Sequence, residues 1–430
     1  MFSHVIYKYS ANPSSDWTTV STSYIIEIRL NFERNPPMSN TLNKNSKVRL
    51  LENAEDLLQF RKIQSTAFVS SFDSLNYEYK PHTGPSTIWG YGNPATSSMV
   101  IHDFDTWFDG HLVKTTGVGG VASLPEARGQ GGIRDIFAAL LPAWRENDVV
   151  FSTLYPFSHV FYRKFGYELV QRGHEYTIPM EALKGFRCEH PVEMVTDAET
   201  LKDMYREFGC GQNLCICRKD SQWDRVAKDP YHVRRYTYRI GDVAFVTFKP
   251  VDPESDKGYT LRCLDIVYRD AAALRSVLGF LYAMRAQYFE VNLKLPASVP
   301  LMHMIPECYD VKLEVSANGM GRIVNVPRAL ELMRYPVRSG AFSVQVTDDS
   351  LPINTGCYLV HYAGGKAVSV EKIEGCEDPD LTVNVQVLTQ LVLGALTVDE
   401  ALYLEGVQCA DPACLRDIFV RKDIYFTDGF

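Results

Sequence analysis

The sequence predicts a mixed α+β protein with about three domains, and three observations support this prediction. First, 430 residues are enough for about three domains of ordinary size. Second, residues 119–167 follow the order strand, glycine-rich turn, helix, strand, short helix and strand. Third, a similar strand and helix order returns at 243–286, and the sequence from 321 onward alternates in polarity before an amphipathic stretch at 385–396.

The chain begins with a segment, residues 1–46, that we predict to be a flexible extension. It is rich in Ser, Asn, Thr and Pro, and Pro36-Pro37 precedes the polar run SNTLNKNSK. Met38 is a candidate for the natural initiator, because sequence typical of a folded domain starts at Lys47. The intact mass of the natural protein tests this hypothesis.

The first domain, predicted for residues 47–186, opens with a helix at 53–68. The apolar face of this helix is formed by Leu57, Leu58, Phe60 and Ile63. Farther along, Asp109-Gly110 stands between two apolar runs and predicts a hairpin turn. The polar residues that lead into this turn are His102, Asp103, Asp105 and Asp109. We interpret them as a polar loop rather than a metal site.

A glycine-rich turn, Arg128-Gly129-Gln130-Gly131-Gly132, lies between a strand-like run and a helix. From Ile133 onward, apolar residues recur with helical spacing, so the helix is expected to start directly after the glycines. Backbone N–H groups at a helix N-terminus bind anions, and glycine lets a ligand approach the backbone closely. The turn is therefore a candidate pyrophosphate site. Considered alone, a plain strand-to-helix link explains the glycines equally well.

A buried strand is predicted at 149–155, where Pro156 ends it, and a short segment follows that closes at Gly166. This segment contains Tyr162 in an aromatic setting with Phe161 and Phe165. Tyr162 is either a functional phenol or part of an aromatic core, and the residues alone leave both interpretations open.

The element order of 119–167, with the sequence FYRKFGY at its end, resembles the GCN5-related N-acetyltransferase (GNAT) superfamily. The C-terminal part includes RIVNVPRALELMRYP from Arg322, NTGCYLV and the ending DIFVRKDIYFTDGF. It resembles the sterol carrier protein-like domain that closes Eis-type (enhanced intracellular survival) acetyltransferases. Together the resemblance spans residues 47–430 and implies two tandem GNAT folds followed by that C-terminal domain.

The resemblance implies acetyl-CoA as co-substrate and direct transfer of acetyl to an amine through a tetrahedral intermediate, without a metal. Tyr162 is the implied proton donor to the CoA sulfur, and the main-chain carboxylate of the final residue, Phe430, is the implied proton acceptor. The implied cofactor-binding residues are Val121, Ala122, Ser123, Arg128, Gly129, Gln130, Gly131, Gly132, Ile133, Arg134, Phe157 and Ser158.

This sequence departs from the broad pattern in two places. Ile133 stands where the superfamily usually has glycine or alanine, although Eis-type proteins tolerate a branched residue there. Gly429 stands before the final aromatic residue, where some relatives carry an acidic residue, so the amine preference is left open.

By the same resemblance, residues 187–320 form a degenerate second GNAT-like domain, and 321–430 form the sterol carrier protein-like domain. Tyr268-Arg269-Asp270 stands where the second domain would need a glycine cradle, so we expect it to shape the substrate cleft and not to bind cofactor. The third domain is expected to bring the C-terminus to the first domain. Whether it binds a lipid is left open.

Composition and charge agree with a soluble enzyme. Hydrophobic residues make up 46% of the chain, no apolar run is long enough for a membrane span, and no signal peptide is evident, so we expect a cytoplasmic protein. The formal charge, 44 − 52 = −8, argues against a nucleic-acid binder and is compatible with cationic substrates.

Ten cysteines are scattered along the chain, as is typical of reduced thiols. The closest group would need a fourth ligand and a more usual spacing to hold a metal; it comprises Cys210, Cys215 and Cys217.

The leading hypothesis is an acetyl-CoA-dependent N-acetyltransferase acting on a cationic small molecule such as an aminoglycoside. Two alternatives stay open: acetylation of protein lysines or N-termini, and a non-catalytic acyl-CoA or lipid carrier. Intact Arg128, Gly131 and Tyr162 favour an enzyme. By resemblance, the protein is expected to form a homohexamer.

Overall fold

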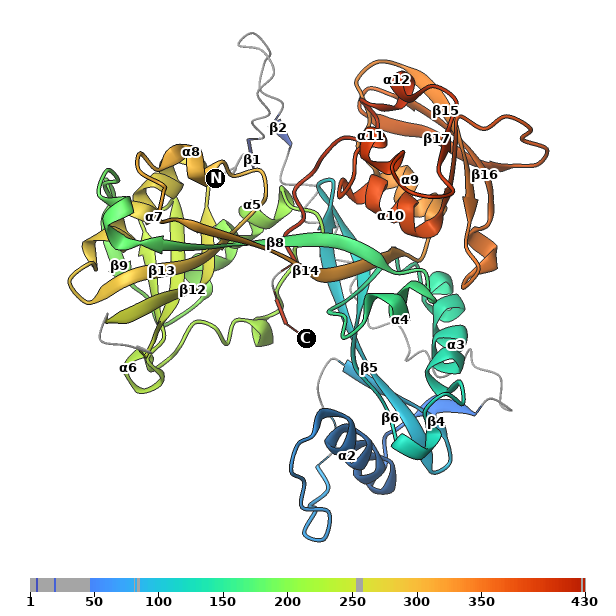
Figure 1. Ribbon diagram of the computed structural model, residues 1–430, viewed down its shortest axis with the longest axis horizontal. Coiled ribbons are helices and arrows are strands. Elements are labelled where there is room, and N and C mark those ends of the chain that lie inside the picture. Colours follow the sequence, from blue (N-terminus) through green and yellow to red (C-terminus); the bar gives the residue numbers. More distant parts are fainter. Residues whose placement is uncertain are drawn as a thin grey trace. The chain divides into compact units, whose positions relative to one another are not determined.

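The structure, a computed structural model, describes residues 5–6, 19–20, 47–80, 82, 86–252, 258–426 and 428–429 (Figure 1). The chain divides into two units, Met1–Asn43 and Lys44–Phe430. In the first unit, β1 (Val5–Ile6) pairs antiparallel with β2 (Thr19–Val20). The candidate initiator Met38 lies outside the described residues, as does most of the predicted extension.

In the second unit, twelve strands of the described residues form one sheet, in the order β3-β4-β5-β6-β7-β14-β8-β13-β12-β11-β10-β9. The first six are β3 (Val48–Leu50), β4 (Ser86–Gly92), β5 (Ala95–Phe108), β6 (His111–Ser123), β7 (Phe151–Leu154) and β8 (Glu168–Pro179). The others are β9 (Val192–Met194), β10 (Tyr236–Ile240), β11 (Ala244–Val251), β12 (Tyr259–Tyr268), β13 (Tyr288–Leu295) and β14 (Lys312–Ile323).

The helices connected to this sheet are α2 (Ala54–Phe68), α3 (Gly132–Glu146), α4 (His159–Arg163), α5 (Lys202–Cys210), α6 (Pro230–Val233), α7 (Ala271–Ala283) and α8 (Leu301–Met304). A second sheet has the order β17-β16-β15-β18-β19. Its strands are β15 (Gly340–Thr347), β16 (Gly356–Ala363), β17 (Lys366–Ile373), β18 (Leu381–Asn384) and β19 (Gln408–Cys409). Its helices are α9 (Val326–Leu332), α10 (Val385–Leu393), α11 (Val398–Ala401) and α12 (Pro412–Leu415). The predicted mixed α+β fold is confirmed.

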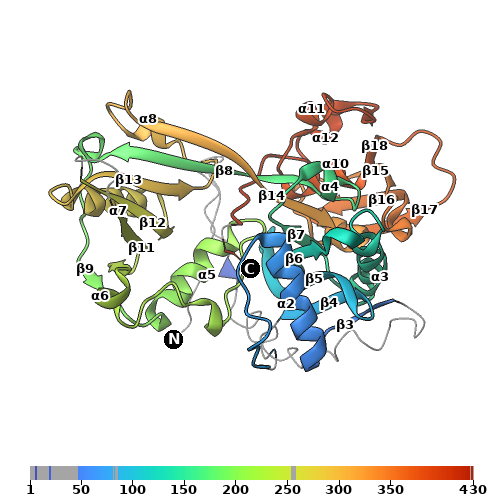
Figure 2. The same cartoon turned by 60° about the horizontal axis from the view of Figure 1, so that its bottom comes forward.

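Local sequence explains the first helices. The Asn53 side chain accepts a hydrogen bond from the backbone N–H of Asp56 and caps α2, which crosses β5 and β6 (Figure 2). The helix predicted after the glycines is α3. Its predicted apolar stripe is buried, with each side chain at most 1% exposed at Ile136, Phe137, Leu140, Leu141 and Trp144. The burial of this stripe anchors α3 to the sheet.

The predicted hairpin is confirmed, since β5 ends at Phe108 and β6 begins at His111. Both turn residues, Asp109 and Gly110, have positive φ, as a two-residue hairpin turn requires. The prediction of a polar loop before the turn is wrong, because His102, Asp103 and Asp105 lie within β5.

The alternation of side chains along β5 explains why these residues were wrongly predicted to form a loop. Asp103 pairs with Thr116 of β6 and Asp105 with Lys114, while Phe104 and Phe108 are buried on the other face of the strand. The two carboxylates therefore sit on one face of a long strand that is apolar on its other face.

A strand from late in the chain joins the two halves of the large sheet. Beyond β7 the neighbour is β14, whose residues 320–323 pair with β7 and whose residues 312–321 pair with β8 (Figure 1). The third part of the chain packs through α10 on β8 and β14, so one apolar core includes Phe151 of β7, Val344 of β15 and Leu388 of α10. The proposed domain limits at 187 and 321 therefore fall inside a continuous hydrogen-bonded assembly.

Candidate active site

Strands β6 and β7 diverge in the middle of the sheet. Their parallel pairing ends at Val118 and Leu154, yet β6 continues to Ser123. Within the described residues, no other strand adjoins β6 on that side. Val121, Ala122 and Ser123 lie on this unaccompanied stretch, where the strand edge can hydrogen-bond to an extended ligand. A free strand edge of this kind can hold an extended chain such as a pantetheine arm.

A bulge shapes the start of that stretch. The register of β5 against β6 shifts between Ser98 and Val100, and Gly120 of β6 has a φ of +54°. The Gln64 side chain of α2 donates a hydrogen bond of 2.7 Å to the Gly120 carbonyl. The bulge therefore re-aims the backbone of β6 where the two strands diverge.

Replacing Gly120 by Ala is expected to lower the free energy of unfolding by about 1–3 kcal/mol and to raise KM for acetyl-CoA. A Cβ there would lie 2.8 Å from a Val100 methyl in addition to its positive φ. Chemical denaturation and initial rates measure both effects. Gly375→Ala is the matched control, because Gly375 has a φ of +70° but no atom close to a new Cβ. Equal losses in the two variants would contradict a packing role for Gly120.

The glycine turn ends at an uncapped helix. Gly129 and Gly131 have φ values of +77° and +88°, and Gly131, the N-cap of α3, makes no side-chain capping hydrogen bond. A Cβ on Gly132 would lie 3.0 Å from the Ser97 Cβ, so the helix start approaches β5 closely. Arg128, Gln130 and Arg134 are exposed around this turn. The first N–H groups of α3 are thus presented with positive charge beside them, which fits a pyrophosphate.

The corresponding position of the second half is different. Helix α7 is capped by the Asp270 carboxylate, which accepts hydrogen bonds from the backbone N–H groups of Ala272 and Ala273 at 2.9 and 3.0 Å. A carboxylate at a helix N-terminus both occupies the donors and repels a phosphate. Of these two helix starts, that of α7 is capped by a carboxylate and that of α3 has no side-chain cap.

Tyr162 lies on α4, whose N-cap is Ser158: the Ser158 hydroxyl accepts a hydrogen bond from the Phe161 N–H. The Tyr162 side chain is 3% exposed and packs edge-on against Phe157 and Phe161. Burial, and to a smaller extent Tyr167, raises the pKa of Tyr162 above its ordinary value. The hydroxyl stays protonated at neutral pH and makes no hydrogen bond to the residues that the structure describes, so it can donate to a ligand.

A buried ion pair fixes the turn after α4. Arg322 of β14 is fully buried, forms a 2.6 Å ion pair with Asp348 and donates to the Phe165 carbonyl. Gly166 has a φ of +78°, and a Cβ there would lie 2.7 Å from the Arg322 guanidinium. The third part of the chain therefore helps to hold the segment that carries Tyr162.

The C-terminal segment reaches the end of β7. The rings of Tyr155 and Phe426 stack 4.6 Å apart, and the Tyr155 hydroxyl lies 3.2 Å from the Phe426 carbonyl and 3.1 Å from the Asp428 carbonyl. Tyr155 directly follows β7, at the point of divergence. Phe430 itself lies outside the described residues, so its predicted role stays a prediction.

The other predicted site residues take two positions. The turn and the first turn of α3 hold Arg128, Gly129, Gln130, Gly131, Gly132, Ile133 and Arg134. Phe157, 69% exposed, and Ser158 lie between β7 and α4. The sequence analysis assigned no site role to Tyr155 or Asp428, although an aromatic residue at the end of the predicted strand, directly before Pro156, was a signal for Tyr155.

Two carboxylates lie on the same face of β5, away from its apolar side. Burial raises the pKa of both Asp103 and Asp105, although the positive charges of Lys219 and Lys114 act in the opposite direction. The segment beside them is tied to β5 by hydrogen bonds from Cys217 N–H to the Asp105 carbonyl and from Lys219 Nζ to the Asp103 carbonyl. Across the described residues, no group of three potential metal ligands is found.

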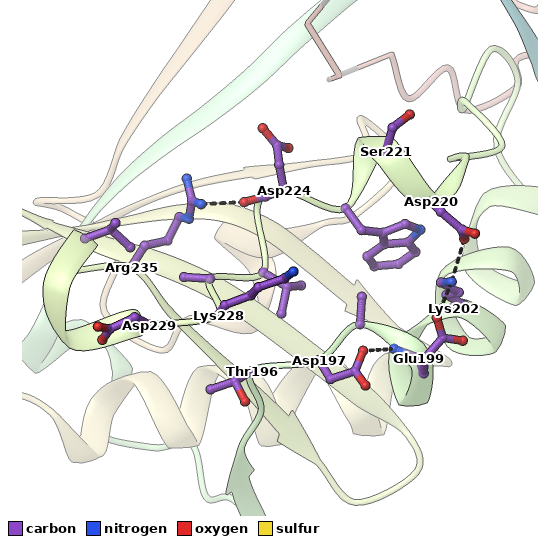
Figure 3. Close-up of a pocket in the computed structure, with 15 residues that line it drawn as sticks. Thr196, Asp197, Glu199, Lys202, Asp220, Ser221, Asp224, Lys228, Asp229 and Arg235 are labelled. Carbon is purple, nitrogen blue, oxygen red and sulfur yellow. Dashed lines mark hydrogen bonds and ion pairs between the residues drawn. The ribbon is translucent and has the colours of Figure 1, made fainter. Parts of the chain in front are cut away.

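A pocket of about 620 Å³ lies apart from these residues, beside α5 and α6 (Figure 3). Among its charged residues, Lys202 forms ion pairs with both Glu199 and Asp220, and the Arg235 guanidinium donates to the Asp224 backbone carbonyl. None of the predicted site residues lines it. The volume of this pocket alone therefore does not identify it as the active site.

Comparison with known families agrees with this geometry. Residues 47–170 and residues 214–323 each match an acetyltransferase (GNAT) domain, and residues 326–427 match a sterol carrier protein domain. No curated protein matches the chain significantly.

Solved structures share the fold at low sequence identity. A GCN5-related N-acetyltransferase from Anabaena variabilis is 24% identical, with a TM-score of 0.75 over 88% of this chain and 100% of that one. A probable N-acyltransferase from Enterococcus faecalis is 21% identical, with a TM-score of 0.73 over 89% and 100%. Eis1 from Mycobacterium abscessus is 19% identical, with a TM-score of 0.73 over 89% and 99%.

The fold and its matched domains define an acyltransferase of the GNAT class. The chain belongs to the GCN5-related N-acetyltransferases, in the Eis-type arrangement of two GNAT domains followed by a sterol carrier protein domain. The resemblance stated from the sequence is confirmed. No helix within the described ranges has both the length and the apolar character needed to cross a membrane.

Proposed function

We propose that this enzyme transfers acetyl from acetyl-CoA to an amine of a cationic small molecule, of the aminoglycoside kind. One observation carries the proposal: Tyr155, at the point where β6 and β7 diverge, contacts the C-terminal segment, and α4 with Tyr162 begins four residues after Tyr155. A thioester arm, an acid and a base must converge in this way for acetyl transfer.

The residues of the first GNAT domain fit acetyl-CoA. The N–H groups that open α3, with Arg128 and Arg134, would hold the pyrophosphate, and the edge of β6 at Val121, Ala122 and Ser123 would hold the pantetheine arm. Acetyl-CoA supplies the activated acetyl group and a thiolate leaving group. Tyr162 would protonate that sulfur, since its raised pKa keeps the phenol protonated throughout the neutral range.

The proposed base is the main-chain carboxylate of Phe430. Support comes from Asp428, two residues earlier, whose carbonyl lies 3.1 Å from the Tyr155 hydroxyl at the end of β7. A carboxylate is a weak base, so an amine would lose its proton to it directly or through water as the bond to acetyl forms. No metal is needed in this account.

The negative side chains of β5 favour a cationic acceptor. Asp103 and Asp105 share a face beside the segment that holds Cys217 and Lys219, and the chain as a whole carries a charge of −8. An acceptor with several ammonium groups would be attracted to such a surface.

Thiol release from acetyl-CoA, measured with panels of aminoglycosides, polyamines, lysine peptides and N-terminal peptides, tests the proposal. The expected result is turnover that is fastest with a polycationic small molecule. Faster turnover with the peptides would favour a protein acetyltransferase, whereas tight acetyl-CoA binding without turnover of any amine would favour a carrier. The cytoplasmic location and the hexamer stay predictions from the sequence.

A further inference from the structure

The second GNAT domain contains a cavity of about 360 Å³ between β12 and β13. Strand β12 lines it with Arg262, Cys263 and Leu264, and β13 lines it with Asn292 and Lys294. The remaining lining residues include Arg225 and Tyr425, which come from outside these strands. Tyr425 belongs to the C-terminal segment, so the end of the chain reaches this cavity.

This cavity lies where β12 and β13 diverge, as β6 and β7 do in the first domain. The parallel pairing of β12 and β13 ends at Arg262 and Asn292, but β12 continues to Tyr268. A bulge at Leu264 follows directly. Asp265 pairs with Thr247 and Cys263 with Phe248, so Leu264 between them has no partner on β11. In the first domain, β6 likewise has a bulge and continues past its last pair with β7. The two halves of the duplication thus share the same strand geometry.

In the second domain, side chains of the protein itself bind at the point where β12 and β13 diverge. Arg225 Nη1 donates to the carbonyl of Leu264, the bulged residue, at 3.1 Å and to Asp265 Oδ1 at 2.7 Å. Arg225 also lies 3.1 Å from Asp428. The backbone acceptor at the bulge is therefore used internally, and the capped start of α7 offers no phosphate site. At the strand divergence of this domain, an arginine side chain therefore takes the backbone acceptor.

Four charged residues form what we call the carboxylate clamp: Arg218, Arg225, Asp265 and Asp428. Arg218 donates to Asp428 through Nε and Nη2 at 2.8 and 2.6 Å and to Asp265 through Nη1 and Nη2 at 3.0 and 2.7 Å. The Tyr205 hydroxyl lies 3.3 Å from Asp428 Oδ2. Asp428 is thus held by two guanidinium groups and a phenol.

The clamp is a closed, neutral set of charges in the protein interior. The side chains of Arg218, Asp265 and Asp428 are 1%, 5% and 11% exposed, and that of Arg225, at the edge of the set, is 24% exposed. Burial alone would raise the pKa of Asp265, but the charges of Arg218 and Arg225 outweigh it and lower that pKa. Two positive and two negative groups satisfy one another, and removing any one leaves an uncompensated buried charge.

We infer that the second GNAT domain uses its vacated cofactor geometry to anchor the C-terminal segment, and that Asp428 is a positioning residue for the Phe430 carboxylate. The anchor acts from two sides: the clamp holds the Asp428 side chain, and Tyr155 holds its carbonyl beside β7. Only Gly429 separates Asp428 from Phe430, so fixing Asp428 keeps the Cα of Phe430 within two residue lengths, about 7 Å, of the Asp428 Cα. This inference rests on the proposed role of Phe430 in acetyl transfer.

The test combines Asp428→Asn with two readouts. The kcat for amine acetylation is expected to fall about 10- to 100-fold, because small misplacements of a reacting group have effects of that size, while KM for acetyl-CoA stays within about twofold. Carboxypeptidase A, followed by intact mass, is expected to release Phe430 at least about tenfold faster than from the wild type, because the segment is no longer held.

Two further variants control for folding. Asp399→Asn removes an ion pair with Arg416 that is about half exposed, and should change neither readout. Arg225→Met combined with Asp428→Asn keeps Arg218 paired with Asp265, so buried charge stays balanced while the anchor is lost. Its melting temperature should be closer to the wild type than that of Asp428→Asn, with Phe430 still released quickly.

The inference is overturned if both Asp428 variants keep the wild-type kcat and the slow release of Phe430. The rate at which carboxypeptidase releases Phe430 does not depend on turnover. An enzyme inactive toward every amine would therefore contradict the proposed function, and the release rate would still decide whether the C-terminal segment is anchored. Fast release with unchanged kcat would show that the segment is anchored but that its position does not matter for the reaction, which also overturns the positioning role.

Discussion

Replacing Tyr162 by Phe is expected to lower kcat by about 100-fold or more and to leave KM for acetyl-CoA within about twofold. The variant loses the hydroxyl that would protonate the departing thiolate, while the ring keeps its contacts with Phe157 and Phe161. Steady-state kinetics with saturating amine, together with direct binding of CoA, measure the two quantities.

Tyr167→Phe is the matched control, since Tyr167 lies in the same aromatic group. Its hydroxyl is hydrogen-bonded to Ser152 at 2.6 Å, and the residue is 0% exposed. Its loss should cost about 1 kcal/mol of stability without a comparable fall in kcat. If Tyr167→Phe were the more damaging change to kcat, or Tyr162→Phe were fully active, Tyr162 would be a packing residue.

The pH dependence follows from the direction of the Tyr162 pKa. A phenol whose pKa is raised by burial keeps its proton to a higher pH than an ordinary tyrosine, whose value is 10.0. The wild-type kcat should therefore show no alkaline decline from this group below pH 10. A rate that falls with an apparent pKa of about 8, and is unaffected by Tyr162→Phe, would assign the titration to another group.

Extending the chain by one glycine beyond Phe430 is expected to lower kcat by at least about 100-fold. The extension moves the carboxylate by up to about 3.8 Å and puts an amide in its place, while Tyr155 and the clamp still hold Asp428. Acetyl-CoA binding should be unchanged, because the cradle before α3 is not touched. Isothermal titration with CoA and initial rates distinguish the two effects.

Phe430→Leu provides the comparison, since it keeps the terminal carboxylate and changes only the side chain. It should retain far more activity than the extended chain. An extended enzyme as active as the wild type would remove the terminal carboxylate from the mechanism, and the base would then have to be sought among other groups such as Asp103.

Local chemistry made part of this protein predictable from its sequence. The apolar stripe of α3 and the Asp109-Gly110 turn each depend on residues close together in the chain, and both appear as predicted. Asp103 and Asp105 were misplaced in a loop because carboxylates are uncommon in strands, and the alternation that reveals a half-buried strand was overlooked.

The rest depends on contacts between distant residues, which periodicity cannot reveal. The insertion of β14 between β7 and β8 follows no local signal. The pairing of Arg218 with Asp428 joins residues 210 positions apart, and the contact of Tyr155 with Phe426 joins residues 271 positions apart. The predicted base lies at the chain end that these contacts hold, so the sequence suggested the role of Phe430 but not the means of placing it.

The most direct test of the account is a crystal structure of the enzyme with CoA. We expect the pyrophosphate on the N–H groups that open α3, the pantetheine along the free edge of β6, and the sulfur within about 3 Å of the Tyr162 hydroxyl, with the Phe430 carboxylate nearby. A sulfur far from Tyr162, or CoA bound between β12 and β13 in place of Arg225, would contradict it.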